Sequence, residues 1–236
     1  MNCWQLILIS LTLLMLGSCH KKKEEQPAIT TYKYTIKIDN NHRVHGKYKI
    51  CSLQNNCSSF SQSFSFSKDS VIETLIMSDN YSTSIYYLNS NGLADSSSSR
   101  ILAGAGSGLS IYKTYYYYNQ DGNLIKMIGD DGMTTYEYQD GNLISKKNTI
   151  NNKTEQTDYT YSIYSTLADY NSFIGAINKN LVQTETVSHA AIKESSTTYQ
   201  YTIGSTGLVE KMNSTIYESG TQYSYITEYE YIMVNK

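Results

Sequence analysis

The stretches of this sequence that could carry out chemistry are few, and the glycine-rich segment from Gly104 to Leu109 comes first. The segment reads GAGSGL and has the glycine content of a phosphate-binding loop. However, Leu109 stands where G-x-G-x-x-G needs its last glycine, and no P-loop lysine follows. The pattern G-x-S-x-G around Ser107 also fails, because Ala105 and Leu109 occupy the glycine positions. We therefore expect a mobile loop here.

Two further pairs could act as acid, base or metal ligand. Glu228 and Glu230 would lie about 7 Å apart on one face of a strand, a separation that could suit glycoside hydrolysis. His42 and His45 could bind a metal only if another segment supplied a third ligand. Solvated strand and turn positions explain both pairs without any site. We predict no catalytic residue, no metal site and no cofactor, so the chain is expected not to be an enzyme.

Tyrosine dominates the aromatic residues, with 24 Tyr against 4 Phe and 1 Trp. Rows of Tyr-x-Tyr could form a packed interior or cross-strand ladders. They could instead form an aromatic platform that grips sugars or apolar ligands, because a ring buries a large area while its hydroxyl stays hydrated or bonded. The candidates for such a ligand-binding platform are Tyr115, Tyr117, Tyr136 and Tyr138.

The elements that position these rings follow from an internal repeat. Residues 116–126 (YYYNQDGNLIK) are echoed at 136–144 (YEYQDGNLI), and the two Asp-Gly pairs lie 19 residues apart. Such a period corresponds to one strand out and one strand back. Tyr-x-Tyr places both rings on one face of a strand, and Asp-Gly then turns the chain because glycine accepts a positive φ. The repeat predicts consecutive hairpins.

The repeat and the composition together predict an all-β fold. Residues 197–203 alternate between apolar and polar, which is typical of an antiparallel sheet with one dry face. The only proline is Pro27, and strands without proline keep their ladder donors. A dozen or more strands favour a curled sheet or closed barrel, with a two-layer sandwich as the alternative. A membrane-spanning barrel is disfavoured, because the alternate positions carry Ser, Thr, Glu and Lys. A short helical turn is expected near residues 167–174.

The N-terminus predicts export and anchoring. Residues 4–16 are rich in Leu and Ile but are too short to span a bilayer, and Leu16-Gly17-Ser18-Cys19 resembles a bacterial lipobox. That resemblance implies a signal peptide over 1–18, lipidation of Cys19 (palmitate among the acyl chains), a polar tether over 19–29 and a single β-domain over 30–236. The alternatives are an ordinary secretory signal and an uncleaved anchor helix. The expected location is the cell envelope, lipid-anchored at the outer membrane and either periplasmic or surface-exposed.

Cys51 and Cys57 would remain after processing. Because exported proteins meet oxidising conditions, they could form a disulfide. Two free thiols remain the alternative, and a metal pair is the least favoured, because zinc-binding cysteines are usually spaced more closely.

The pattern Tyr-x-Tyr followed by Asp-Gly-Asn-Leu resembles the YD-like repeats of Bacteroidetes outer-membrane lipoproteins of unknown function. The resemblance covers residues 80–236 and includes residues 169–173. It implies a porin-like all-β meander and brings no catalytic residues.

These observations favour a non-catalytic, membrane-tethered protein that binds a glycan or an envelope protein. A lipid or lipoprotein carrier with an apolar lumen and an envelope hydrolase are the alternatives. The net charge of -2 argues against a nucleic-acid partner.

Overall fold

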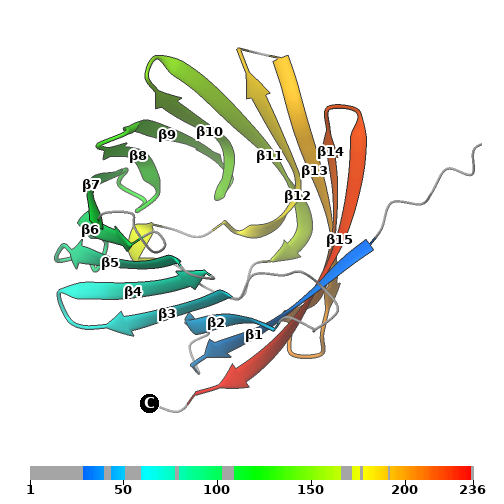
Figure 1. The fold of residues 1–236 in the computed structure, drawn as a ribbon, viewed down its shortest axis with the longest axis horizontal. Helices are drawn as coiled ribbons and strands as arrows, with labels where there is room; N and C mark the ends of the chain where they lie inside the picture. Colours follow the sequence, from blue (N-terminus) through cyan, green and yellow to red (C-terminus); the bar gives the residue numbers. More distant parts are fainter. Residues whose placement is uncertain are drawn as a thin grey trace, which may run out of the picture.

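The computed structural model describes residues 29–39, 44–50, 60–77, 80–102, 109–165, 172–175, 178–190 and 192–234. Within them, 15 strands close into a single barrel (Figure 1). Each strand pairs with its neighbours in sequence, so the sheet is a meander. The predicted all-β fold is therefore confirmed, with a closed barrel rather than a two-layer sandwich. Cys19, Cys51 and Cys57 lie outside the described residues.

The strands form where β-branched residues and tyrosine alternate with polar residues, a pattern that suits a half-buried pleated surface. They are β1 (Ile29–Ile38), β2 (Val44–Ile50), β3 (Phe60–Phe66), β4 (Ser70–Met77), β5 (Asn80–Leu88), β6 (Ala94–Leu102), β7 (Leu109–Tyr118), β8 (Leu124–Gly129), β9 (Gly132–Gln139), β10 (Asn142–Ile150), β11 (Lys153–Ser165), β12 (Asn180–His189), β13 (Ile192–Ile203), β14 (Val209–Glu218) and β15 (Thr221–Met233). The predicted loop at Gly104–Leu109 falls between β6 and β7. Only Leu109, the first residue of β7, belongs to the described part.

The first and last strands close the barrel. In an up-and-down meander every second strand runs the same way, so an odd number of strands leaves β1 and β15 parallel. The two pair in parallel from Ile29 opposite Ser224 to Ile38 opposite Met233. Each of the other strands instead pairs antiparallel with the next one along the chain, as β14 does with β15. Closure removes the free edges through which open sheets aggregate.

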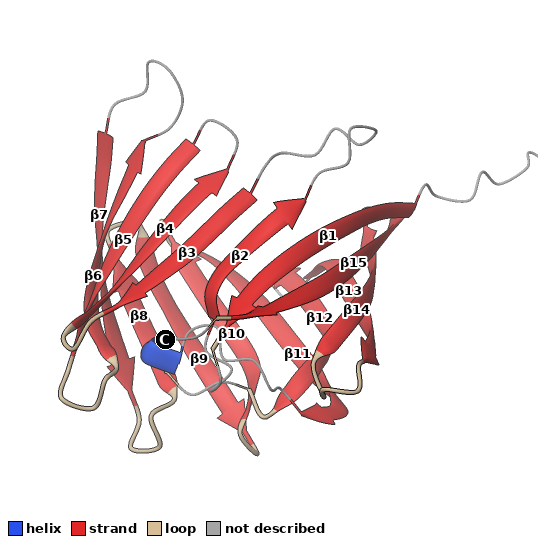
Figure 2. Cartoon of the chain, turned by 90° about the horizontal axis from the view of Figure 1, so that it is seen from below, coloured by secondary structure: helices blue, strands red, loops and turns tan. Residues whose placement is uncertain are grey.

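The repeated sequence motif forms hairpin turns at one end of the barrel (Figure 2). The Asn119 side-chain oxygen accepts hydrogen bonds from the backbone N–H groups of Asp121 and Asn123, at 3.0 and 2.9 Å. Gly122 then takes a φ of 78°, which a residue with a side chain adopts with strain. The same pair of bonds recurs at Asn89. The asparagine therefore fixes the turn through its side chain.

A short 3-10 helix, η1 (Ser172–Ile174), lies inside the barrel near this same end (Figures 1 and 2). Its Phe173 is only 5% exposed. The ring centroid of Phe173 lies 4.9 Å from that of Tyr86, 6.3 Å from that of Phe64 and 6.4 Å from that of Phe66. We call this the plug end. The predicted helical turn is confirmed at Ser172–Ile174, while residues 166–171 lie outside the described part.

The buried core lies at the plug end. Ile36, Ile38, Val44 and Val71 are almost completely buried, and they cluster with Phe64, Tyr86, Ala94, Phe173 and Leu208. Elsewhere the inner wall is half-buried. The fold is therefore anchored at one end by apolar packing, and elsewhere by the closed ladder.

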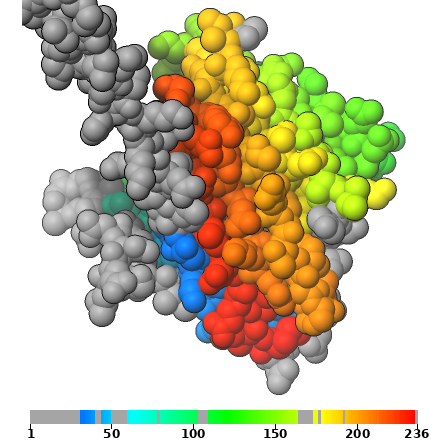
Figure 3. Space-filling view, turned by 90° about the vertical axis from the view of Figure 1, so that its right-hand side faces the viewer, coloured from blue at the N-terminus to red at the C-terminus, as the bar shows by residue number. Residues whose placement is uncertain are grey.

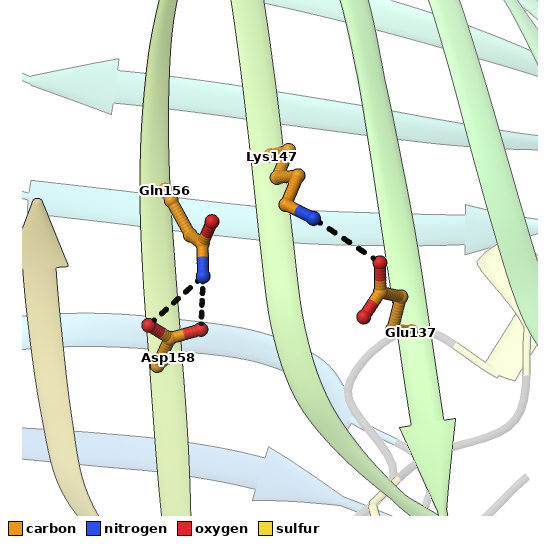
Figure 4. A network of polar contacts seen from close by, with 4 residues as sticks. All are labelled: Glu137, Lys147, Gln156 and Asp158. Atoms are coloured by element: carbon orange, nitrogen blue, oxygen red, sulfur yellow. Dashed lines mark hydrogen bonds and ion pairs between the residues drawn. The ribbon is translucent and has the colours of Figure 1, made fainter. Parts of the chain in front are cut away.

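Polar pairs lie on the outer wall of the later strands, a side of the barrel that faces the viewer in Figure 3. On β9 and β10, Glu137 and Lys147 form an ion pair at 3.3 Å, and on β11 the Gln156 amide donates to Asp158 at 2.8 Å (Figure 4). Exposed pairs of this kind contribute little stability, but they keep the surface hydrated. In the part of the chain that the structure describes, no helix has the length and apolarity needed to cross a membrane.

Candidate functional site

The candidate site is the inner wall of the barrel, where aromatic residues recur on the odd-numbered strands. These strands all run toward the plug end, because the meander alternates direction. Each carries at least one ring that faces inward, and those of β3 and β5 belong to the buried core at the plug end. In strand order from β1 these rings are Tyr34, Phe64, Tyr86, Tyr116, Tyr136, Tyr159, Tyr199 and Tyr229. The repeat of the sequence is therefore also a repeat of rings around the barrel.

A second set of rings lies two residues further along, and their hydroxyl groups bond to the backbone. Tyr118 donates to the carbonyl of Ala94 at 2.9 Å, and Tyr201 donates to that of Val182 at 2.7 Å. Tyr161 and Tyr231 bond in the same way to carbonyls of the preceding strand. The strand register shifts beside each of these carbonyls. Since a bulge takes backbone groups out of the ladder, the second tyrosine supplies the missing donor.

Several tyrosines of the first set bond instead to side chains of the preceding strand. Tyr86 donates to Glu73 at 2.7 Å, and Tyr199 donates to Glu185 at 3.2 Å. Tyr116 shares a hydrogen bond of 2.9 Å with Ser97. These hydroxyl groups therefore lie along the wall, so the flat faces of the rings are the surfaces left for a ligand.

Charged side chains stand among the rings. Glu73 also accepts a 2.6 Å hydrogen bond from Gln62. The Lys47 ammonium lies 4.5 Å from the ring centroid of Tyr34, and the Lys49 ammonium lies 4.0 Å from that of Tyr32. Both are at cation–π distance. The wall therefore combines aromatic faces with groups that can form strong hydrogen bonds.

Partial burial shifts the pKa values of tyrosine and lysine side chains on the inner wall. The pKa values of four inner tyrosines are raised to about 12, and burial is the largest cause in each case. These tyrosines are Tyr136, Tyr159, Tyr199 and Tyr229. Burial also lowers the pKa of Lys47. Both directions disfavour the charged form, so the wall is drier than the outer surface.

Two cavities open on the inner wall toward the end opposite the plug. One has a volume of about 200 Å³ and is lined by residues that include Tyr112, Asp130 and Asn148. The other has a volume of about 270 Å³ and is lined by residues that include Asn148, Glu155 and His189. Because both cavities include Asn148 and Ile150, they are adjacent. The two cavities therefore offer both acidic and basic side chains beside the rings.

The structure separates the four predicted platform tyrosines into two pairs. Tyr136 and Tyr138 face inward on β9, and Tyr136 donates to the Met127 sulfur at 3.6 Å. Tyr115 and Tyr117 face outward on β7 and are 49% and 43% exposed. A single platform made of all four rings is therefore wrong, because the pairs lie on opposite faces of the sheet.

Those of the other candidate residues that the structure describes do not assemble into a catalytic centre. Glu228 and Glu230 share the outer face of β15, where Glu228 pairs with Lys33 at 3.3 Å. His45 contacts Asp39 at 3.1 Å, while His42 lies outside the described residues. Among the described residues, no three His, Cys, Asp or Glu side chains gather as metal ligands would.

Sequence reasoning missed Glu73, Glu185 and Lys47 as members of the inner wall. A signal for Glu73 was present, because it stands at alternate spacing between Val71 and Leu75 on an apolar strand face. Glu185 and Lys47 lack flanking residues that are as clearly apolar, so only the strand pairing places them.

The Tyr201 hydroxyl provides a direct test of the second set of rings. We expect Tyr201→Phe to lower the free energy of unfolding by about 1–2 kcal/mol, because it removes the donor to the Val182 carbonyl. Tyr217→Phe is the matched control, since Tyr217 is 49% exposed, and it should change stability by less than about 0.5 kcal/mol. Urea denaturation followed by circular dichroism measures both variants. Equal losses would show that the hydroxyl bond contributes nothing specific.

Comparison with known proteins gives a fold but no relative by sequence. No protein-family model matches the chain, and no curated protein matches it. Among solved structures, it is similar to a porin-like protein from Bacteroides uniformis, with a TM-score of 0.52 and 16% identity over 78% of this chain and 83% of that chain. Identity this low shows the fold alone. The chain is thus a closed β-barrel of porin-like fold.

Proposed function

We propose that this chain is a non-catalytic β-barrel, lipid-anchored in the cell envelope, whose inner wall binds a glycan. The observation that carries the proposal is the recurrence of inward-facing tyrosines whose hydroxyl groups are already bonded to the wall. Rings held in this way present their faces with little loss of side-chain freedom on binding. Flat aromatic faces pack well against the C–H faces of sugar rings.

The charged groups of the wall favour a hydroxylated ligand over an alkyl chain. Glu73, Glu185 and Lys47 lie among the rings, and each can bond to a sugar hydroxyl. An alkyl chain in the same place would remove these groups from water without offering hydrogen bonds, which is unfavourable. The wall therefore supports glycan binding better than the carrier function.

The two adjacent cavities extend this wall toward the end opposite the plug. Ligand sites usually combine apolar surfaces with a few polar groups that fix orientation. Asp130, Asn148, Glu155 and His189 supply such groups beside Tyr112. A glycan that lay along the wall could therefore meet ring faces and polar groups together.

The lipid anchor rests on residues 16–19 (LGSC), which lie outside the described part. Feeding cells an alkyne-tagged palmitate should label the wild-type chain but not Cys19→Ser. If the two chains label equally, the anchor is wrong, whereas the proposal for the inner wall would stand.

A printed array of bacterial and host oligosaccharides tests the binding. We expect the full chain to bind at least one glycan class, and Tyr136→Ala to weaken that binding roughly tenfold, the loss of one aromatic contact. Tyr117→Ala is the matched control, because Tyr117 faces outward on the neighbouring region of the sheet. Absence of binding, or equal losses in the two variants, would contradict the proposal. Lipid that co-purifies with the chain in native mass spectrometry would favour the carrier function instead.

A further inference from the structure

Exposed apolar side chains gather on the outer face of β5–β7. They include Tyr81, Leu102, Leu109, Ile111, Tyr115 and Tyr117, which are 43% to 58% exposed. The register brings Tyr81 opposite Leu102, and Leu102 opposite Leu109, so these three form a continuous row across the three strands. A cavity of about 500 Å³ lies in this surface. A patch of this kind on a soluble face usually marks an interaction site.

The exposed charges at the centre of this face are cationic, while the Asp130 carboxylate, in the turn after the adjacent β8, accepts a 2.9 Å hydrogen bond from the backbone N–H of Lys113. Arg100 and Lys113 are exposed among the apolar residues, and Lys126 on the adjacent β8 lies 4.5 Å from the ring centroid of Tyr117. The carboxylate nearest in β6 is Asp95, which occupies the strand bulge at the plug end and accepts a 3.2 Å hydrogen bond from Asn89. The centre of the face therefore combines apolar surface, tyrosine and positive charge.

The outer faces of β9, β10, β15 and β1 differ in their charges from the apolar face of β5–β7. Their outer residues include Glu137, Lys147, Glu228 and Lys33, which form ion pairs of opposite sign. Such side chains are unfavourable in contact with lipid. An apolar belt therefore does not continue around the described barrel.

We propose that the outer face of β5–β7 docks on the surface of an anionic lipid bilayer, so that the barrel lies with this side against the membrane. Tyrosine rings favour the interface between headgroups and acyl chains, and Arg and Lys stems reach from apolar surface to charged headgroups. Anionic headgroups complement Arg100, Lys113 and Lys126. A second copy of the chain fits less well, because docking this face on itself would bring the same cations together.

Tryptophan fluorescence tests the orientation on vesicles. Trp4 is the only tryptophan, so the full chain with Trp4→Phe provides a silent background. Into it we would introduce Ile111→Trp on the proposed face, and Thr198→Trp on the outer face of β13 as the matched control. The vesicles contain phosphatidylglycerol and phosphatidylcholine with brominated acyl chains. We expect bromine to reduce the Ile111→Trp emission by roughly half and to leave Thr198→Trp nearly unchanged, as interfacial burial on one side requires.

The outcomes distinguish the possible occupants. Because both variants share the same N-terminal segment, only the difference between them reports the orientation. Equal quenching of both tryptophans indicates lipid all around the barrel, and quenching of neither excludes docking, so either result overturns the proposal. An Ile111→Trp emission that shifts to the blue with protein concentration, without vesicles, would identify a second copy as the occupant and would also overturn it.

Charge removal tests the contribution of the cations. We expect the double variant Arg100→Gln, Lys113→Gln to weaken vesicle binding roughly tenfold or more at low salt, since each cation near an anionic surface adds to affinity. Lys147→Gln with Lys211→Gln, on the opposite wall, is the matched control. If both double variants bind equally, the cations of β6 and β7 take no part in docking.

Discussion

Raising the pH from about 10 to about 12 is expected to unfold the barrel, because the inner tyrosines lose their protons more easily when the chain unfolds. An unfolded tyrosine ionises at its ordinary pKa of 10.0, whereas burial raises the pKa of Tyr136, Tyr159, Tyr199 and Tyr229 to about 12. Burial also raises the pKa values of Tyr86, Tyr118, Tyr161, Tyr201 and Tyr231. The folded barrel therefore holds more protons than the unfolded chain in this window.

The sign of the effect follows from proton linkage. A group whose folded pKa is raised contributes stability that is fully present below its unfolded pKa and is lost as the pH rises through its folded pKa. Lys47 acts in the opposite direction, because burial lowers its pKa from 10.5, so its destabilising effect fades as the pH rises toward that value. Because the shifted tyrosines outnumber this one lysine, the net result is a loss of folding stability as the pH rises.

Urea midpoints at pH 8, 10, 11 and 12 would measure this loss, and phenolate absorbance near 295 nm would follow the titration. We expect stability to fall steeply above about pH 10 and part of the phenolate signal to appear only with unfolding. Tyr199→Phe removes one of these groups and should reduce the slope slightly. A complete phenolate signal from a barrel that is still folded would contradict the prediction.

The fold was predictable because its determinants are local. The turn at Asp140 and Gly141 has φ values of 51° and 80°, the two positive values that an Asp-Gly hairpin requires. The pattern Thr134, Tyr136, Tyr138 against Thr135 and Glu137 likewise reveals a strand with one drier face. Repetition of such units along the chain indicates a meander, and avoidance of free edges favours its closure.

The direction in which the rings face was less predictable. Residues 115–118 are four consecutive tyrosines, so alternation places two rings on each face and does not say which face is inside. Closure of the barrel decides it. Tyr118 then meets Ala94 from an earlier hairpin, while Tyr117 stays outside with Lys126.

The plug was also only partly predictable. A helical turn was expected near residues 167–174, but the local sequence does not show that Phe173 turns back into the barrel. Its contacts with Phe64 and Tyr86 join segments about a hundred residues apart in sequence. Parallel pairing of β1 with β15 is equally non-local, since it depends on the total number of strands.

Gly132, the first residue of β9, is expected to tolerate no side chain. Its φ is 157°, and a Cβ placed there would overlap the carbonyl oxygen of Thr149 and lie 3.1 Å from the Ile150 side chain. Thr149 belongs to β10, where it stands opposite Met133, so the carbonyl cannot move without disturbing the ladder. We expect Gly132→Ala to lower the free energy of unfolding by about 3 kcal/mol or more, as clashes with fixed backbone do.

Alanine variants of two other glycines serve as controls, because they show what replacing a glycine costs without a clash against fixed backbone. Gly220 has a φ of 79° in an open turn, where a Cβ would meet nothing within 4 Å, so Gly220→Ala should cost about 1 kcal/mol through backbone strain alone. At Gly204 a Cβ would meet the Glu210 carboxylate, the end of a flexible side chain that can turn away, so Gly204→Ala should also be mild. Urea denaturation of the three variants would rank them. A Gly132→Ala barrel as stable as the Gly220→Ala barrel would show that β9 and β10 can separate slightly without loss, and the close approach at Gly132 would then not constrain the fold.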